Sequence, residues 1–504
     1  MSLIKRNLAA NFVGSAWMPL LMVVVAPLYL LTLGKEPFGL VGVYIVLQSV
    51  VALLDMGLSM TLNREFARLS LQPDSRPQMR DLLRTLECVY WLTALLIVAV
   101  VAASAYPIAQ LWLKPEVMSK HDVQSAIWMM APALALQWPL TLYSGGLMGL
   151  QRQASLAGIN VVMLTVRFAG VLPLLWYVSP TIQWFFGYQA ATGLLHTAVA
   201  AIWLWRGLAA GHHKPEVRWS LLAPLFHFAT GLFLISVLSM LLTQVDKVVL
   251  SNLLTLEMFG YYTIVTMIAT ALYRLFAPIF FALYPRFTQL AEMKDVPELS
   301  LLYHRGCQLM AVLTFSAAVV IAFFPRQVLL VWTGNYEVAD QMGRVLSLLI
   351  IGTAFNGLMY LPYGMQLAHG WTGLALRSNI VAVVLLVPGT YILARIFGAA
   401  GAASGCIILN AGYLIVNIQL MHRRILPGEI ARWYLADSAL PLIGPLAVTA
   451  CAWWLLPDNL GRWEWAGALA AVFVLSLLTS GASAPLVRAA TIETLTRPSK
   501  APGR

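Results

Sequence analysis

The chain has 504 residues, of which 60% are hydrophobic and only 11% are charged, and its formal net charge is +11. A soluble domain carries about 25% charged residues, so this composition excludes a soluble globular protein and indicates one that lies in a membrane. The four cysteines, Cys88, Cys307, Cys406 and Cys451, form no C-x-x-C motif and have no His at ligand spacing. We therefore expect no disulfide and no zinc site. The sequence has no Gly-rich phosphate loop and no H-E-x-x-H motif, and we expect no other metal and no cofactor.

Fourteen apolar runs follow one another along the chain, and each has at least the roughly 20 residues that a helix needs to cross hydrocarbon. They cover residues 9–33, 38–62, 86–106, 124–149, 156–178, 181–205, 221–253, 257–284, 303–325, 342–367, 373–397, 400–421, 437–456 and 463–487. Barrel strands would be alternating segments of about 10 residues. The runs predict an all-α integral membrane protein with about 14 transmembrane helices. The first run lacks an A-x-A-type cleavage site, so we expect it to be retained.

Lys and Arg residues concentrate in alternate connections between these runs, with 22 on one side and 7 on the other. Because positive residues favour the cytoplasmic side, both termini are predicted to be cytoplasmic. This asymmetry, with contact to anionic lipid, accounts for the basic net charge. Nucleic acid is not needed to explain it, and we expect none as a partner.

The chain contains an internal repeat, first visible in the matching dipeptides Phe38-Gly39 and Phe259-Gly260. Further identical pairs recur at the same or a slightly smaller offset: Phe66 with Phe287, Leu69 with Leu290, Tyr143 with Tyr363, and Asn160 with Asn379. Duplicated, strongly apolar units are typical of transporters, and an even number of helices per copy makes the two copies parallel.

The repeat predicts two six-helix lobes that flank a central cavity. The first lobe is predicted to comprise residues 1–219 and the second residues 220–425. Residues 426–504 would add two transmembrane helices without a partner in the repeat, and a short basic tail that we expect to be disordered.

Charged side chains within apolar runs are the most informative single residues, because an ionised group at mid-bilayer costs about 2.5 to 3.5 kcal/mol on insertion scales. Arg167 and Arg274 lie deep in their runs, Asp246 and Lys247 interrupt another, and Asp55 lies nearer a run's end. Structural alternatives remain open. Asp246 and Lys247 can close internal ion pairs with charges on neighbouring helices. Asp55, in its D-x-G sequence, can bond local backbone near a helix kink. The arginines can bond a carboxylate or backbone carbonyls that proline leaves free.

Polar uncharged residues at repeat-related positions form a second group. Asn160 and Asn379 can line a cavity or simply make interhelical hydrogen bonds. His196, His227, His304 and His369 are interpreted as packed or interfacial residues and are not assigned a function. The connections between runs are short, which argues against an enzyme that places acid and base groups in a long external loop.

Several segments resemble one known family. FGLVGVY, LDMGLSMTLNREFARL, LMGLQRQASLAGINVV, TQVDKVVLSNLLTLEMFGYYTI and ALYPRFTQLAE occur in this order between about residues 1 and 425. They are similar to the polysaccharide transporter branch of the multidrug/oligosaccharidyl-lipid/polysaccharide exporter superfamily, which includes flippases for O-antigen and exopolysaccharide repeat units. The resemblance implies a V-shaped pair of six-helix bundles that works by alternating access, and the fourteen-helix form also occurs in that family.

The expected function is translocation of undecaprenyl-pyrophosphate-linked oligosaccharides across the bacterial inner membrane. Arg167, Arg274 and Lys247, with Asn160 and Asn379, are the candidates for a cationic cavity, since arginine and lysine bind phosphate. Asp55 and Asp246 are the candidates for coupling to protons or sodium. Expected partners are the lipid-linked oligosaccharide, membrane lipids, a polysaccharide polymerase and a chain-length regulator. The alternatives are a cation-coupled drug or solute exporter of the same superfamily, and a membrane polymerase or ligase.

Overall fold

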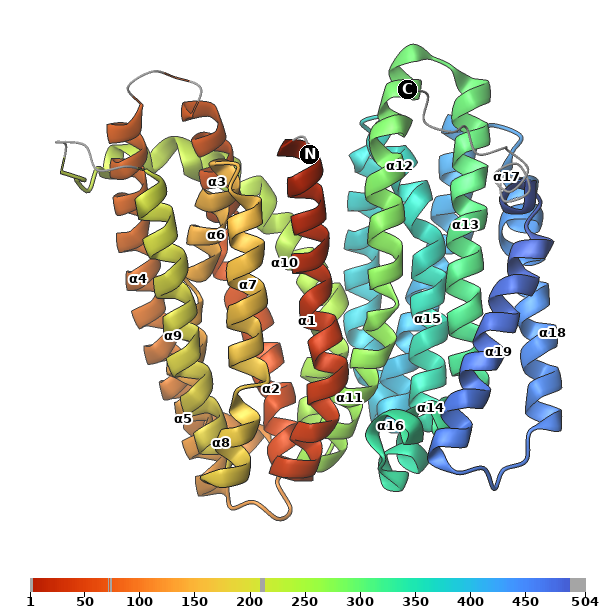
Figure 1. Cartoon of the computed structure of the whole chain (residues 1–504), viewed down its shortest axis with the longest axis horizontal. Coiled ribbons are helices and arrows are strands. Elements are labelled where there is room, and N and C mark those ends of the chain that lie inside the picture. The colour runs from red at the N-terminus through yellow and green to blue at the C-terminus, as the bar shows by residue number, and fades with distance from the viewer. Residues whose placement is uncertain (1–2, 71, 73–74, 209–213, 490–504) are drawn as a thin grey trace, which may run out of the picture. The chain divides into compact units, whose positions relative to one another are not determined.

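The computed structural model describes the chain except residues 1–2, 71, 73–74, 209–213 and 490–504 (Figure 1). In the described part every regular element is a helix and no strand occurs. The chain forms two compact units, Met1–Tyr261 and Tyr262–Arg504. The expected disordered tail at residues 496–504 lies outside the described residues.

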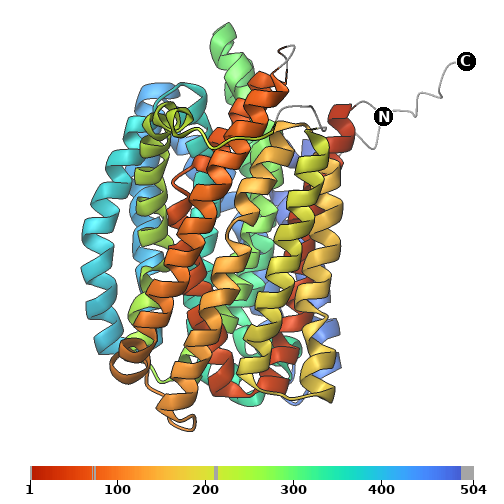
Figure 2. The ribbon, with the colours of Figure 1, turned by 90° about the vertical axis from the view of Figure 1, so that its left-hand side faces the viewer.

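The first unit contains ten helices and the start of an eleventh. They are α1 (Leu3–Leu33), α2 (Lys35–Ala52), α3 (Leu58–Leu69), α4 (Arg76–Pro107), α5 (Lys120–Gln137), α6 (Leu140–Gly149), α7 (Gln153–Phe168), α8 (Val171–Tyr177), α9 (Ile182–Gly207), α10 (Ala223–Leu253) and α11 (Leu256–Ala271). Helices α7 and α9 pack against each other, and α7 also packs against α1. Figure 2 shows these helices running side by side.

The second unit contains the rest of α11 and the remaining helices. They are α12 (Tyr273–Met293), α13 (Val296–Phe323), α14 (Pro325–Thr333), α15 (Tyr336–Ala368), α16 (Thr372–Ile425), α17 (Ile430–Arg432), a π-helical turn η4 (Trp433–Ala439), α18 (Leu440–Leu455) and α19 (Arg462–Ser483). Helix α15 contacts α12, α13, α14 and α16, and so forms the centre of this unit. The last two helices pack against each other and against α13.

The predicted all-α membrane fold is confirmed. Each of the fourteen predicted runs coincides with a helix, half of a bent helix, or two helices in succession. Nine helical stretches in the described part are long and apolar enough to cross a membrane by themselves. The predicted lobe boundary at 219/220 concerns the sequence repeat and stays a prediction, whereas the boundary between compact units falls within α11.

Two helical segments are interrupted at residues with a left-handed backbone conformation, one between α2 and α3 and one within α16. After the 3₁₀ turn Leu53–Asp55 (η1), Met56 has φ 48° and Gly57 has φ 78°, which ends α2 and starts α3 in a new direction. In α16, Gly398 has φ 60° and ψ −141°, a conformation that glycine adopts without the strain of a side chain. Helix α16 therefore folds back as a hairpin and provides two of the predicted spans.

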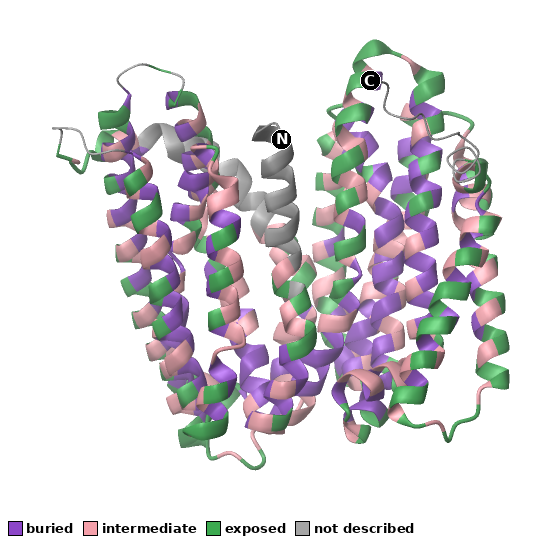
Figure 3. Cartoon of the chain, viewed as in Figure 1, coloured by how far each residue is buried: buried purple, intermediate pink, exposed green. Residues whose placement is uncertain are grey.

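Apolar side chains occupy both the interior and the outer surfaces. In the second unit, buried residues of α12, α13, α15 and α16 form one core, and a smaller core around Phe324 and Trp465 joins α13 to α19. Exposed residues occur along many helices (Figure 3). They include large apolar side chains such as Leu95 and Leu96. Such exposed apolar surface is expected where hydrocarbon replaces water.

Candidate functional site

Arg167 lies inside the first unit and is 1% exposed. Its Nε donates to Gln189 Oε1 at 2.5 Å, and its Nη2 donates to the Tyr44 hydroxyl at 3.0 Å. Among the residues that the structure describes, its buried Nη1 has no hydrogen-bond partner. The bonded partners are uncharged, so neither of the structural alternatives, a carboxylate or freed carbonyls, accounts for this arginine. A buried cation with an unused donor is energetically costly, which marks it as a functional candidate.

Two pairs of polar side chains connect α7 and α9, and Arg167 with Gln189 is one of them. We call the two pairs the polar ladder and each pair a rung. The other pair is Asn160 and His196, with 3.1 Å between Asn160 Oδ1 and His196 Nε2. Asn160 lies seven residues before Arg167 on α7, and Gln189 lies seven residues before His196 on α9. Seven residues make about two helical turns, so the two rungs share one face of each helix. Asn160 and Arg167 could be identified from the sequence as single residues, whereas Gln189 was not singled out. The matching seven-residue spacing on the two runs is the signal that identifies the ladder.

Asp55 lies half-buried at the break between α2 and α3. It accepts hydrogen bonds from the hydroxyls of Ser59 at 2.8 Å, Thr141 at 3.3 Å, and Tyr90. The helix break expected for its D-x-G sequence is present, but these three donors are side-chain hydroxyls rather than local backbone. Asp55 is therefore held by donors from three helices, which gives a carboxylate that neutral groups stabilise.

Asp246 and Lys247 lie half-buried next to each other on α10. Lys247 Nζ donates to the backbone oxygen of Thr243 and to Gln244 Oε1, both at 3.1 Å, so both of these partners come from its own helix. Asp246 is also engaged by other groups. The lysine is held by neutral oxygens, which leaves its positive charge uncompensated by these bonds.

The remaining candidates lie in the second unit. Arg274, in the first turn of α12, is exposed. Asn379, in the first half of α16, accepts from the Tyr413 hydroxyl at 2.8 Å. Asn379 thus bonds to the following span, as its repeat partner Asn160 does. Arg167 and Arg274 belong to different units, and their convergence on one substrate group stays a prediction.

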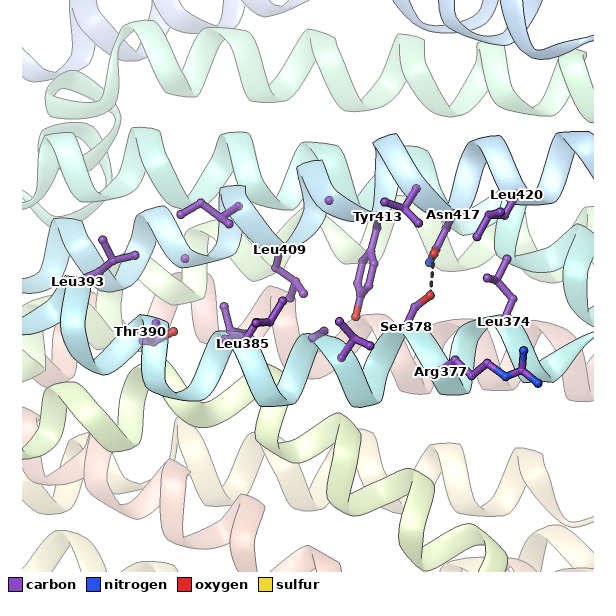
Figure 4. A pocket seen from close by; sticks show the side chains of 18 of the residues that line it. Leu374, Arg377, Ser378, Leu385, Thr390, Leu393, Leu409, Tyr413, Asn417 and Leu420 are labelled. Atoms are coloured by element: carbon purple, nitrogen blue, oxygen red, sulfur yellow. Dashed lines mark hydrogen bonds between the residues drawn. The ribbon is translucent and has the colours of Figure 1, made fainter.

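A groove of about 610 Å³ lies between the two halves of α16. Leucines line most of its length, including Leu385 and Leu409, whereas one end carries Arg377 beside a Ser378 to Asn417 hydrogen bond of 2.7 Å (Figure 4). The groove is therefore apolar along its walls and polar and basic at one end.

In the second copy of the predicted repeat, the groove lies at the positions that correspond to the polar ladder of the first copy. The offset that relates Asn160 to Asn379 also relates Arg167 to Leu386 and Gln189 to Ile408. Both Leu386 and Ile408 line the groove. Where the first copy of the predicted repeat has a charged side chain, the second copy has an apolar surface. No group of three or more His, Cys, Asp or Glu side chains suited to a metal ion occurs in the described part of the chain.

Comparison with known proteins identifies the family. The family model described as "Polysaccharide biosynthesis protein" matches residues 4–291, more than half of the sequence. The chain belongs to the polysaccharide biosynthesis protein family. The matched range contains Asp55, Arg167, Asp246, Lys247 and Arg274.

This family member is also similar to individual proteins. It is 22% identical over 411 residues to the "Putative O-antigen transporter" of Shigella flexneri, covering 80% of this chain and 94% of that protein. Its structure is similar to the lipid II flippase MurJ in an inward closed conformation, with a TM-score of 0.67, 13% identity and coverage of 98% and 99%. An inward-facing multidrug resistance MATE family transporter gives a TM-score of 0.65, 13% identity and coverage of 83% and 98%.

These structural similarities establish the fold. The family member is a multi-pass membrane protein with the fold of MurJ and the MATE transporters. The similar proteins are transporters and a flippase by name, in agreement with the prediction that this chain is not an enzyme.

Proposed function

We propose that this protein is a flippase that moves undecaprenyl-pyrophosphate-linked oligosaccharides from the cytoplasmic to the periplasmic leaflet of the bacterial inner membrane. It would do so by alternating access during polysaccharide synthesis, with both termini in the cytoplasm. Family membership and the similarity to an O-antigen transporter support a saccharide cargo. The shared fold with a lipid II flippase supports a cargo that is joined to a lipid.

The buried Arg167 is the structural observation that carries this proposal. A cation with an unused donor, placed in the interior of a membrane bundle, suits an anionic group that arrives with the substrate. Pyrophosphate provides such a group, and arginine binds phosphate oxygens through paired N–H donors. A drug exporter for organic cations would instead be expected to bury an acid at this position.

The groove in α16 is the observation that supports a cargo with a lipid part. An isoprenoid chain is apolar along its length and carries phosphate at one end, which is the order of polarity that the groove presents from Leu393 to Arg377. We propose that the groove holds part of the polyprenyl chain while the saccharide moves. A polysaccharide polymerase and a chain-length regulator are the proposed protein partners, since they would consume the product.

The test is a flipping assay with the purified protein in vesicles. The probe is a fluorescent undecaprenyl-pyrophosphate disaccharide, and a membrane-impermeant reductant destroys the fluorescence of molecules in the outer leaflet. We expect the protein to make the inner-leaflet fraction accessible, and vesicles without protein to keep it protected. Failure to flip this probe, together with gradient-driven movement of a small organic cation, would support the exporter instead.

A further inference from the structure

A fully buried imidazole lies where the C-terminal helices of the second unit pack against α13. His304, on α13, is 0% exposed, and the segment that follows α16 packs against α13 at this point. Each ring nitrogen of His304 faces one carboxylate, Asp437 on one side and Glu429 on the other. The sequence analysis interpreted His304 as a packed or interfacial residue. It is packed, but among charged groups.

Asp437 fixes the proton on one nitrogen of His304. It lies in the π-helical turn η4, and its side chain is 0% exposed. Its Oδ2 accepts from His304 Nδ1–H, and its Oδ1 accepts from Gln308 Nε2 at 2.9 Å. Gln308 in turn accepts from the backbone N–H of Leu486 at 2.8 Å. We assign Asp437 as the carboxylate, since it is the stronger acid of the two, and this places the hydrogen on His304 Nδ1.

The other nitrogen requires one more proton. His304 Nε2 is 3.2 Å from Glu429 Oε2, yet it has no aligned hydrogen bond within the described part of the chain. With Nδ1 protonated, a neutral imidazole presents a lone pair at Nε2, which would face the lone pairs of a carboxylate. One proton, on Nε2 or on Glu429, turns this repulsion into a hydrogen bond. Without it the two groups repel each other.

Glu429 connects this buried position to the exterior. Its side chain is 33% exposed, and it precedes α17 in the turn between two spans. Ser300 Oγ donates to Glu429 Oε1 at 3.4 Å, and Arg432 is 3.6 Å from Oε2. The exposed edge of Glu429 gives water access to the proton, whereas His304 itself is sealed.

The other titratable groups around His304 do not supply the proton. His422, on α16, has Nδ1 2.9 Å from the backbone oxygen of Ile418, and its Nε2 faces the Tyr303 hydroxyl at 3.4 Å. His422 Nδ1 therefore donates to this backbone oxygen, and the two ring nitrogens of His422 have partners other than His304. Cys307, on the same helix as His304, is buried. The extra proton therefore belongs to the pair of His304 and Glu429.

We propose that His304 and Glu429 form a proton-binding site that fastens the C-terminal helices to α13. When one proton enters from water, the pair attracts and the segment of residues 426–439 is held against α13. When the proton leaves at higher pH, the pair repels and this segment loosens. This site is independent of the cargo, and its failure would leave the proposed flippase function untouched.

The test is hydrogen–deuterium exchange of residues 426–439 in the full-length protein in lipid nanodiscs between pH 5.5 and 8.5, corrected for the intrinsic pH dependence of exchange. We expect protection in the wild type to fall by about 10- to 150-fold as pH rises, the range for a lost charge-assisted hydrogen bond. Glu429→Gln should keep protection at every pH, because its amide donates without an added proton. Glu298→Gln, in the first turn of α13 and paired with Arg286, is the matched control and should behave as wild type.

Two results would overturn the proposal. One is wild-type protection that does not change with pH, and the other is a Glu429→Gln variant with the same pH dependence as wild type. Glu429→Ala provides a second variant, which removes the carboxylate opposite His304 Nε2. It should lower protection at acidic pH and abolish its pH dependence. A pH dependence that survives in both variants would place the proton elsewhere.

Discussion

Gly39 and Gly260, the glycines of the two repeated Phe-Gly pairs, pack directly against each other. A Cβ on Gly260 would lie 3.0 Å from the backbone nitrogen of Gly39, and a Cβ on Gly39 would lie 2.1 Å from the backbone oxygen of Leu256. Beside them, Lys35 pairs with Glu257 at 3.2 Å. The feature that reveals the repeat in the sequence is therefore itself the contact between the starts of α2 and α11.

Gly39→Ala is expected to weaken this contact, because the added methyl group meets backbone that cannot move aside. Overpacking of this kind costs on the order of 1–3 kcal/mol. The measurement is the thermal unfolding midpoint of the purified protein. Gly158→Ala is the control, since no atom lies within 4 Å of its added Cβ and alanine favours a helix by about 0.5–1 kcal/mol. An unchanged midpoint in Gly39→Ala would contradict the packing argument.

The repeat also relates two acids that the sequence analysis did not connect. Glu36 and Glu257 are related by the same offset as the Phe-Gly pairs that follow them. Glu36 is 4% exposed and accepts from the backbone N–H groups of residues 116–118, between 2.5 and 2.9 Å, while Glu257 pairs with Lys35. Extending the comparison by two residues would have identified both acids as part of this junction.

The spans could be predicted because their length is imposed by the bilayer, which acts on each helix separately. The side chains that contact one another across two helices could not be predicted, since these contacts depend on how each helix is rotated against its neighbours. Arg167 was identified as deep and charged, but Tyr44 and Gln189 bind it from other helices. His304 was left without a role for the same reason, because its partner Asp437 lies on a segment far along the chain.

Asp55 and Asp246 give a prediction about energy coupling. We expect that Asp55→Asn, Asp246→Asn or both remove the dependence of transport on an imposed proton gradient while the protein still inserts. Asn keeps the shape of the side chain but cannot bind and release a proton near neutral pH. The measurement is the initial flipping rate in vesicles with and without the gradient. Asp122→Asn, an exposed position, is the control. Full gradient dependence in both variants would leave these acids with a structural role only.

The orientation in the membrane is tested by reporter fusions. Fusions at residue 290, at residue 212, which lies outside the described residues, and at the C-terminus should report the cytoplasm. Those at residues 118 and 335 should report the opposite side. The reason is the excess of Lys and Arg in alternate connections. If residues 118 and 290 reported the same compartment, the predicted arrangement of two parallel six-helix repeats would be wrong.

The groove in α16 can be filled without disturbing its walls. Gly389 and Gly412 both line it, and no atom lies within 4 Å of a Cβ added to either. Gly389→Leu and Gly412→Leu should therefore fold normally but lower the flipping rate of the polyprenyl probe by several-fold. Gly373→Leu, equally unobstructed but outside the groove lining, should not. Equal rates in all three variants would remove the groove from the proposed lipid path.

Arg167 provides the strongest test of the anion site. If it binds pyrophosphate, Arg167→Lys should be impaired as well as Arg167→Ala, because lysine keeps the charge but loses the paired donors. A lost charge-assisted bond is worth roughly 1.5 to 3 kcal/mol, or about 10- to 150-fold in affinity. Arg274→Ala is also expected to lower export of the lipid-linked sugar. The measurement is export of the lipid-linked sugar per amount of inserted protein.

Tyr44→Phe separates the charge from its supporting contacts. It removes one neutral partner of Arg167 and leaves the guanidinium in place, so binding of an anion should persist. If Arg167 only holds α7 to its neighbours, Tyr44→Phe and Arg167→Lys should lower the amount of folded protein, and the surviving protein should transport normally. Normal export by well-inserted Ala variants at both Arg167 and Arg274 would exclude them as the anion site, and the exporter alternative would then be favoured.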